Sequence, residues 1–182
     1  MAINTPKGKL HGFSKTERLC NFALKNLLFQ DGEQFSEHPL KIYWKIIDPN
    51  PEKLFFEKNK TIFEGNKQKQ NEIRTRQNPS YPLKKLPENA LFHYPAKCLV
   101  GVSSKTHKSA VLRNKIKRLV KEAYRNNKQG FYSFLNESNA FCILGIIYTG
   151  KPIYSYCELE EKIIVSLHKL EKKISEYKYK CD

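Results

Sequence analysis

The chain has 182 residues, of which 40% are hydrophobic and 28% are charged, and its formal net charge is +15. This length suits one domain with its own core, and the apolar content excludes a chain that is too polar to fold. The excess of 33 Lys and Arg over 18 Asp and Glu favours a polyanionic partner, with nucleic acid as the first candidate.

The cysteines and the apolar runs indicate the compartment. The five cysteines form no CxxC motif and no Cys/His cluster with zinc spacing, so we interpret most of them as small core residues in a reducing cytosol. The first residues, MAINTPKGKLHGF, lack the apolar segment of a signal peptide. The longest apolar run, Ala140 to Tyr148, is far below the roughly 20 residues of a spanning helix. We expect a cytoplasmic protein without a membrane partner.

The first predicted elements are a helix and a strand. Ser14 and Glu17 have capping-box spacing, and apolar residues follow at helical spacing, which predicts a helix from about Lys15 to Phe29. Leu40 to Ile47 is β-branched and aromatic and predicts a strand. From about 48 to 94 the chain carries five prolines and a polar tract rich in Asn, Gln and Lys. That composition indicates a long loop or a partly disordered insertion, with room for one strand.

Regular structure resumes after the insertion. Ala96 to Ser104 predicts a strand, and Phe141 to Gly150 predicts a second. A closing helix is predicted from about Cys157, with Ser155 and Glu158 as its capping box. Its apolar stripe is Leu159, Ile163, Leu167, Leu170 and Ile174.

A basic helix is predicted between these two strands, in the stretch KSAVLRNKIKRLVKEAYRNNK that covers residues 108–128. A helical projection gives it one apolar side and one cationic side, with Lys115 and Glu122 on the flank. Nine Lys and Arg against one Glu over residues 105–128 carry +8 of the net charge of +15. The apolar side holds Leu112, Ile116, Leu119, Val120 and Ala123, and the cationic side holds Arg113, Asn114, Lys117, Arg118, Lys121 and Arg125.

Four explanations of this cationic side were weighed. Most charge-rich helix faces are merely solvated, but such faces usually mix both signs, whereas neighbours such as Arg113 and Lys117 repel each other. Helices that bind membranes or calmodulin-like acceptors usually show bulky Trp, Phe or Leu on the apolar side. A helix for the DNA major groove needs side chains that read bases, and Asn114 is the one obvious amide. A polyanion bound through its phosphates is favoured, and the other three stay open.

The sequence shows no self-sufficient nuclease site. Mg²⁺ needs several oxygen ligands at once, and the acidic residues are scattered singly apart from the cap of the closing helix. His107 is a lone histidine in a basic loop, where the residue more often contacts phosphate or has no role than acts as a general base. We therefore predict no catalytic residue and no metal ligand, and expect another molecule to carry any chemistry.

Residues 110–125, AVLRNKIKRLVKEAYR, resemble the signature helix of the protein subunit of bacterial ribonuclease P, A-V-x-R-N-[RK]-x-K-R-x-x-[RK]-[EQ]-A-[FY]. Lys115 stands where the family most often has Arg, which keeps the charge and loses the planar fork that grips phosphate. Lys108 stands where some members have Gly, and the insertion at 48–94 is longer than the family norm. The order of the other elements extends the resemblance over most of the chain.

The resemblance implies an α+β fold: a single α-β sandwich domain over residues 1–182, ribosomal-protein-like, with a left-handed β-α-β crossover against the usual preference. It implies a protein cofactor of an endoribonuclease that removes the 5′ leader from precursor tRNA. The catalytic RNA subunit would bind the Mg²⁺ ions, and no organic cofactor is expected. The implied partners are that RNA and precursor tRNA, with no obligate protein partner.

The resemblance also implies site residues. The leader would run in a cleft between the first helix and the open sheet face, lined by Phe22 and Tyr43. From the residues alone, Phe22 fits the core slightly better, Tyr43 suits the cleft if Ile42 faces inward, and Trp44 competes for that role. The resemblance implies contacts to the catalytic RNA from eight residues: Lys105, Lys108, Arg113, Asn114, Lys115, Lys117, Arg118 and Lys121. We add Arg125 to this set, because it lies on the same cationic side of the helix.

A second function fits the same basic helix. A non-catalytic RNA-binding or ribosome-associated module would bind RNA with a similar salt dependence. It would leave precursor-tRNA processing unchanged, which distinguishes it from the first function.

Overall fold

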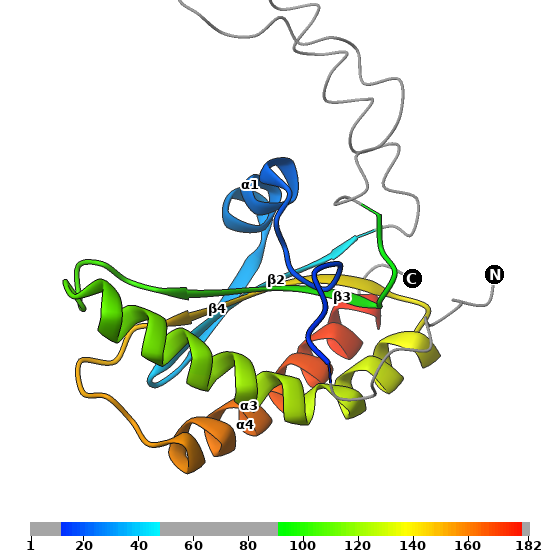
Figure 1. The fold of residues 1–182 in the computed structure, drawn as a ribbon. Coiled ribbons are helices and arrows are strands. Elements are labelled where there is room, and N and C mark those ends of the chain that lie inside the picture. The colour runs from blue at the N-terminus through cyan, green and yellow to red at the C-terminus, as the bar shows by residue number, and fades with distance from the viewer. Residues whose placement is uncertain (1–11, 48–90, 180–182) are drawn as a thin grey trace, which may run out of the picture.

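The computed structural model describes residues 12–47 and 91–179 (Figure 1). Most of the predicted insertion, residues 48–90, lies outside the described residues. The elements in chain order are α1 (Phe22–Asp31), β1 (Glu33–Glu37), β2 (Leu40–Ile47), β3 (Ala96–Val102), α3 (Ala110–Glu137), β4 (Phe141–Tyr148) and α4 (Tyr156–Tyr179). The α+β fold class is confirmed, and the predicted strands β2, β3 and β4 all form.

The four described strands form one mixed sheet in the order β1-β2-β4-β3. β1 pairs antiparallel with β2, and β2 antiparallel with β4, with Tyr43 opposite Gly145. β3 and β4 are parallel, with Cys98 opposite Leu144, so the predicted strand-helix-strand unit through α3 is confirmed. The left hand of this crossover stays a prediction.

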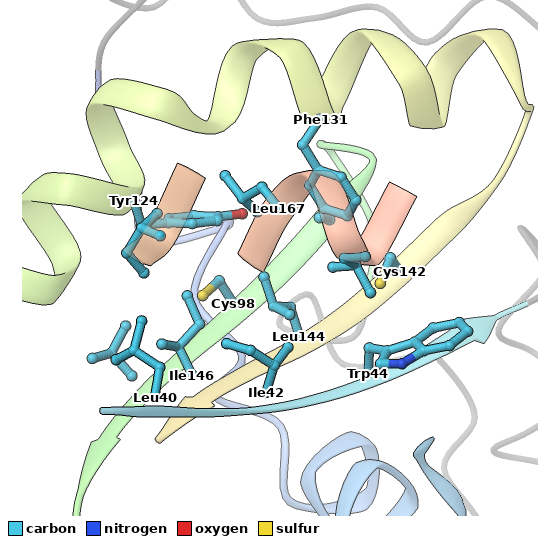
Figure 2. Packing of buried hydrophobic residues seen from close by; sticks show 14 of the residues in the cluster. Leu40, Ile42, Trp44, Cys98, Tyr124, Phe131, Cys142, Leu144, Ile146 and Leu167 are labelled. Atoms are coloured by element: carbon cyan, nitrogen blue, oxygen red, sulfur yellow. The ribbon is translucent and has the colours of Figure 1, made fainter. Parts of the chain in front are cut away.

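The helices cover the two faces of the sheet unequally. α3 and α4 lie together against one face, and α1 lies on the other (Figure 1). Along β2, Leu40, Ile42 and Trp44 are buried and point toward α3 and α4 (Figure 2). Tyr43 therefore points to the α1 face, because successive strand residues alternate. Trp44 is thus a core residue, and the leader contact expected at Tyr43 stays a prediction.

The larger core lies between the sheet and the α3/α4 pair. Every residue of the predicted α4 stripe is buried, and the predicted Ser155–Glu158 cap is present, with the Ser155 amide donating to Glu158 Oε2 at 2.8 Å. On α3 the buried face differs from the predicted stripe, because Tyr124 is fully buried and Leu112 is partly exposed. α3 also continues past Lys128, where Phe131 and Leu135 extend the core (Figure 2).

The predicted start of the first helix was wrong. Ser14 and Glu17 do pair as a capping box, with the Ser14 amide donating to Glu17 Oε2 at 2.7 Å, but they close a turn and not a helix. α1 begins at Phe22, and the side chain of Asn21 caps it by accepting from the Leu24 amide at 3.2 Å. Between the two, the chain bonds to the edge of β3: the Leu19 amide donates to the carbonyl of Cys98 at 3.0 Å.

Glu17 is held in that turn by a buried ion pair. Lys128 on α3 is 2% exposed and Glu17 is 0% exposed, and the Lys128 ammonium donates to Glu17 Oε1 and to the carbonyl of Gly12. Three aromatic rings surround the ammonium, with centroids 5.2 to 5.9 Å from Nζ: Phe13, Tyr94 and Tyr132. The Glu17–Lys128 ion pair therefore joins the segment before α1, dark blue in Figure 1, to the buried side of α3.

Two further features were not predicted. β1, with the sequence EQFSE, is a short polar edge strand that lacks the β-branched run of the other strands. The end of the predicted insertion is ordered: the ring of Phe92 packs on Phe141 with centroids 5.4 Å apart, and Tyr94 packs on Tyr132 at 6.3 Å. Packing against the core thus resumes before Ala96.

The cysteines divide into two kinds. Cys98 and Cys142 are buried in the larger core, as predicted, whereas Cys20 and Cys157 are exposed. Cys181 lies outside the described residues. Burial raises the pKa of the Cys142 thiol to about 12 and that of Cys98 further, so both stay protonated.

Candidate nucleic-acid interface

The turn that precedes α3 is fixed by His107. This residue is buried, its Nε2 lies 2.9 Å from the carbonyl oxygen of Gly150, and its amide donates to the carbonyl of Ser103 at 3.0 Å. His107 therefore fixes the turn by joining it to the carbonyl of Gly150. On either side of it, Lys105 and Lys108 are exposed to solvent.

Arg113 begins the cationic face and also supports the turn. Its Nη1 donates to the carbonyls of His107 and Lys108, at 2.9 and 2.6 Å. The side chain is half-buried, so part of its guanidinium is committed to the protein's own backbone. An RNA contact by Arg113 would use the remaining N–H groups.

The rest of the face follows the helix. Asn114, Lys115 and Arg118 are exposed, whereas Lys117 and Lys121 are half-buried at the border with the core. Among the described residues, no carboxylate lies within ion-pair distance of any cation from Lys105 to Lys121. These positions are Lys105, Lys108, Arg113, Lys115, Lys117, Arg118 and Lys121, which together with Asn114 we call the α3 cationic face.

Two cations of residues 105–128 do not belong to this face. Arg125 forms an ion pair with Glu122 one turn earlier, and the hydrogen bond from Arg125 lowers the pKa of that carboxyl. Lys128 is buried with Glu17, as described above. The predicted RNA contact at Arg125 thus falls on a side chain whose charge is already compensated within the protein.

The two predicted leader contacts occupy different surroundings. Phe22 is 76% exposed, so the suggestion that it belongs to the core was wrong. Tyr43 is half-buried on the α1 face, where Lys41 Nζ lies 5.1 Å from the centre of its ring. The ring centroid of Phe29, which is 46% exposed, lies 5.1 Å from that of Tyr43. Sequence reasoning missed Phe29, although it follows Phe22 by seven residues and therefore shares its helix face.

α1 can approach the sheet closely because β4 carries a glycine beneath it. A Cβ added to Gly145 would lie 3.0 Å from the Leu28 side chain and 3.5 Å from Cβ of Tyr43. The missing side chain thus sets the distance between α1 and the sheet beside Tyr43. The aromatic pair Phe29–Tyr43 lies at this junction, on the face opposite α3 and α4.

Two features are absent from the described residues: a cluster of metal ligands and a membrane-spanning helix. Within residues 12–47 and 91–179, no three His, Cys, Asp or Glu side chains come together as metal ligands. No described helix is long and apolar enough to cross a membrane.

Comparison with known proteins places the chain in a sequence family. The sequence profile of the ribonuclease P family matches residues 13–145, which is well over half of the chain and includes α1, β1, β2, β3, α3 and the first part of β4. No curated protein matches the sequence.

Proposed function

We propose that this chain, which belongs to the ribonuclease P family, is the protein cofactor of that ribonucleoprotein. Membership of the family supports a role in tRNA 5′ processing within an endoribonuclease complex. In the finer proposal the protein binds the catalytic RNA and the 5′ leader of precursor tRNA, and it works in the cytoplasm.

One observation carries this proposal: seven cations of the α3 cationic face have no carboxylate partner in the described structure. Like charges on one surface raise the free energy of the isolated protein, and a bound polyanion removes that cost. Two RNA molecules, catalytic RNA and precursor, repel each other, and cations between them reduce the repulsion. Phosphate contacts of this kind fix position without reading sequence.

The chemistry is assigned to the RNA. The RNA subunit would bind the ions, and the protein would hold the two RNAs in register. This division needs no catalytic residue in the protein.

The leader is proposed to lie on the α1 face of the sheet, beside Tyr43 and Phe22, with Phe29 as an added contact. Stacking of one base on an aromatic ring contributes about 1 to 3 kcal/mol by alanine substitution. Tyr43→Ala should therefore weaken binding of precursor tRNA roughly tenfold or more and leave binding of mature tRNA, which has no leader, unchanged. Gel-shift titrations of both RNAs with the reconstituted complex measure this difference, and equal losses for the two would contradict the assignment.

Reconstitution tests the function itself. A bacterial ribonuclease P RNA and a labelled precursor tRNA are incubated at low Mg²⁺ with and without the protein, and 5′-end maturation is followed on a gel. The protein should restore cleavage, and Lys117→Ala/Lys121→Ala should restore much less. Binding of the RNA without any gain in cleavage would favour the non-catalytic RNA-binding module instead.

A further inference from the structure

Val111 is an exposed apolar side chain at the border of the α3 cationic face. It lies in the first turn of α3 and is 76% exposed. In a helical projection Arg118 and Glu122 share its direction, and the buried residues Ile116 and Val120 point the opposite way. A single exposed valine is ordinary on a protein surface, so its surroundings decide whether it has a role.

Those surroundings form a shallow hollow of about 420 Å³. Val111 and Leu119 supply its apolar lining, and three polar side chains complete it: Asn114, Lys115 and Arg118. None of these three polar side chains has an ion-pair or hydrogen-bonding partner among the described residues. The hollow thus combines an apolar surface, an unbonded amide, a planar guanidinium and an ammonium.

We propose that this hollow receives one unpaired nucleobase of the RNA that docks on the α3 cationic face. The inference rests on the proposed function and deepens it. Charge selects the occupant: a hollow bordered by two uncompensated cations attracts a polyanion, and a base is the apolar part of that polyanion. RNA-binding proteins commonly take unstacked bases against guanidinium planes and read their edges with polar side chains.

The roles of the side chains follow from their chemistry. One face of the base lies on the methyl groups of Val111, and the Arg118 guanidinium stacks beside it. The Asn114 amide, with one acceptor and two donor hydrogens, bonds to the base edge. Lys115 contacts the phosphate that flanks the base. The interface would therefore read one nucleotide, where phosphate contacts alone read none.

Salt dependence separates this contact from the phosphate contacts. Val111→Ala removes two methyl groups and no charge, so affinity for a bacterial ribonuclease P RNA should fall about three- to tenfold at every KCl concentration. The slope of log K against log salt should stay that of the wild type, because no counterion release is lost. Alanine is a good helix former, so the variant keeps α3. Val165→Ala, at an exposed position on α4, is the matched control and should bind like the wild type.

Base-specific footprinting of the same complexes locates the nucleotide. Dimethyl sulfate should show one unpaired base protected by the wild type and exposed again with Val111→Ala, while hydroxyl-radical protection of the backbone persists. Removing that base from the RNA should abolish the difference between wild type and variant. Wild-type affinity for Val111→Ala, or a loss that persists on the abasic RNA, would overturn the proposal.

The same measurements distinguish failure of the nucleobase contact from failure of the proposed RNA docking. If Lys117→Ala/Lys121→Ala weakens RNA binding and Val111→Ala does not, the nucleobase contact is wrong and RNA docking on the α3 cationic face stands. If neither variant changes the affinity, docking on that face fails, and the nucleobase contact fails with it.

Discussion

At the scale of single residues, the buried pair of Glu17 and Lys128 joins segments 111 positions apart in sequence. It holds the turn that precedes α1 against the buried side of α3. Desolvation makes such a pair a modest net contributor to stability while both partners are present. Removing one partner leaves a buried charge without compensation, which is far more costly.

Glu17→Gln should therefore lower the free energy of unfolding by about 3 to 5 kcal/mol, because it leaves the Lys128 ammonium buried without a counter-charge. Urea denaturation at neutral pH measures the loss. Glu17→Gln/Lys128→Met removes both charges and should recover part of it, since the methionine fits among the rings of Phe13, Tyr94 and Tyr132. If the free energy of unfolding of Glu17→Gln lies within about 1 kcal/mol of the wild-type value, the ion pair does not hold the segment before α1 in place.

Cys142 should make the fold sensitive to alkali. Burial raises the pKa of its thiol from 9.0 to about 12, so the unfolded chain ionises first. The stabilisation is fully present below pH 9 and falls as the pH rises toward 12, by roughly 1.4 kcal/mol per pH unit. Between pH 8 and pH 10, under reducing conditions, the wild type should lose about 1 kcal/mol more than Cys142→Ala.

Urea unfolding at the two pH values provides this comparison. Cys157→Ala, which removes an exposed thiol, is the matched control. Equal losses for the wild type and Cys142→Ala would mean that the buried thiol does not contribute to the pH dependence.

At the scale of elements, the junction of α1 with the sheet depends on a glycine. A Cβ added to Gly32, which ends α1, would lie 2.1 Å from the carbonyl oxygen of Leu28 and 3.2 Å from that of Trp44. Gly32→Ala should destabilise the protein by about 1 to 3 kcal/mol, because backbone atoms must move. Thermal unfolding checks the loss.

Gly130 provides the opposite case for the same substitution. It lies within α3, and nothing is within 4 Å of an added Cβ. Gly130→Ala should stabilise the protein by roughly 0.5 to 1 kcal/mol through helix propensity. A Gly32→Ala variant as stable as Gly130→Ala would contradict the packing of α1 described here.

The apolar pattern of the sequence was enough to predict the elements that pack on the core through a regular set of apolar residues. β2, β3 and β4 are apolar runs, and the α4 stripe repeats at helical spacing, so sequence alone located them. The predicted start of α1 was wrong because tertiary contacts overrode a valid local signal. The Ser14–Glu17 capping box exists, but contacts with Lys128 and β3 hold it as a turn. β1 was not predicted, because a polar five-residue edge strand has no apolar pattern of its own and forms by pairing with the neighbouring strand.

The candidate site was predictable to a similar degree. The cationic face follows from helical periodicity, and the resemblance supplied its partner. The pairing of Arg125 with Glu122 was visible as a three-residue spacing and was overlooked. Val111 was overlooked as well, although the same projection places it beside Arg118. The burial of Lys128 was beyond local pattern, because its partner Glu17 is distant in sequence.

At the scale of the whole molecule, the fold separates two surfaces. α3 and α4 cover one face of the sheet, and α1 covers the other (Figure 1). The cations without a carboxylate partner in the described structure lie on α3 and the turn before it, and the Phe29–Tyr43 pair lies where α1 meets the opposite face of the sheet. This separation suits the proposed function, in which a structured RNA docks on one side and the leader on the other.

The salt dependence of RNA binding tests the central claim, that the α3 cationic face seats a structured RNA. Each phosphate contact contributes about 0.7 to 0.9 to the slope of log K against log salt, so Lys117→Ala/Lys121→Ala should flatten the slope by about 1.4 to 1.8. Lys172→Ala/Lys173→Ala, on α4, removes the same charge elsewhere and should keep the wild-type slope. Filter binding of a bacterial ribonuclease P RNA over a KCl series gives both values, and an unchanged slope for the α3 variant would contradict the account.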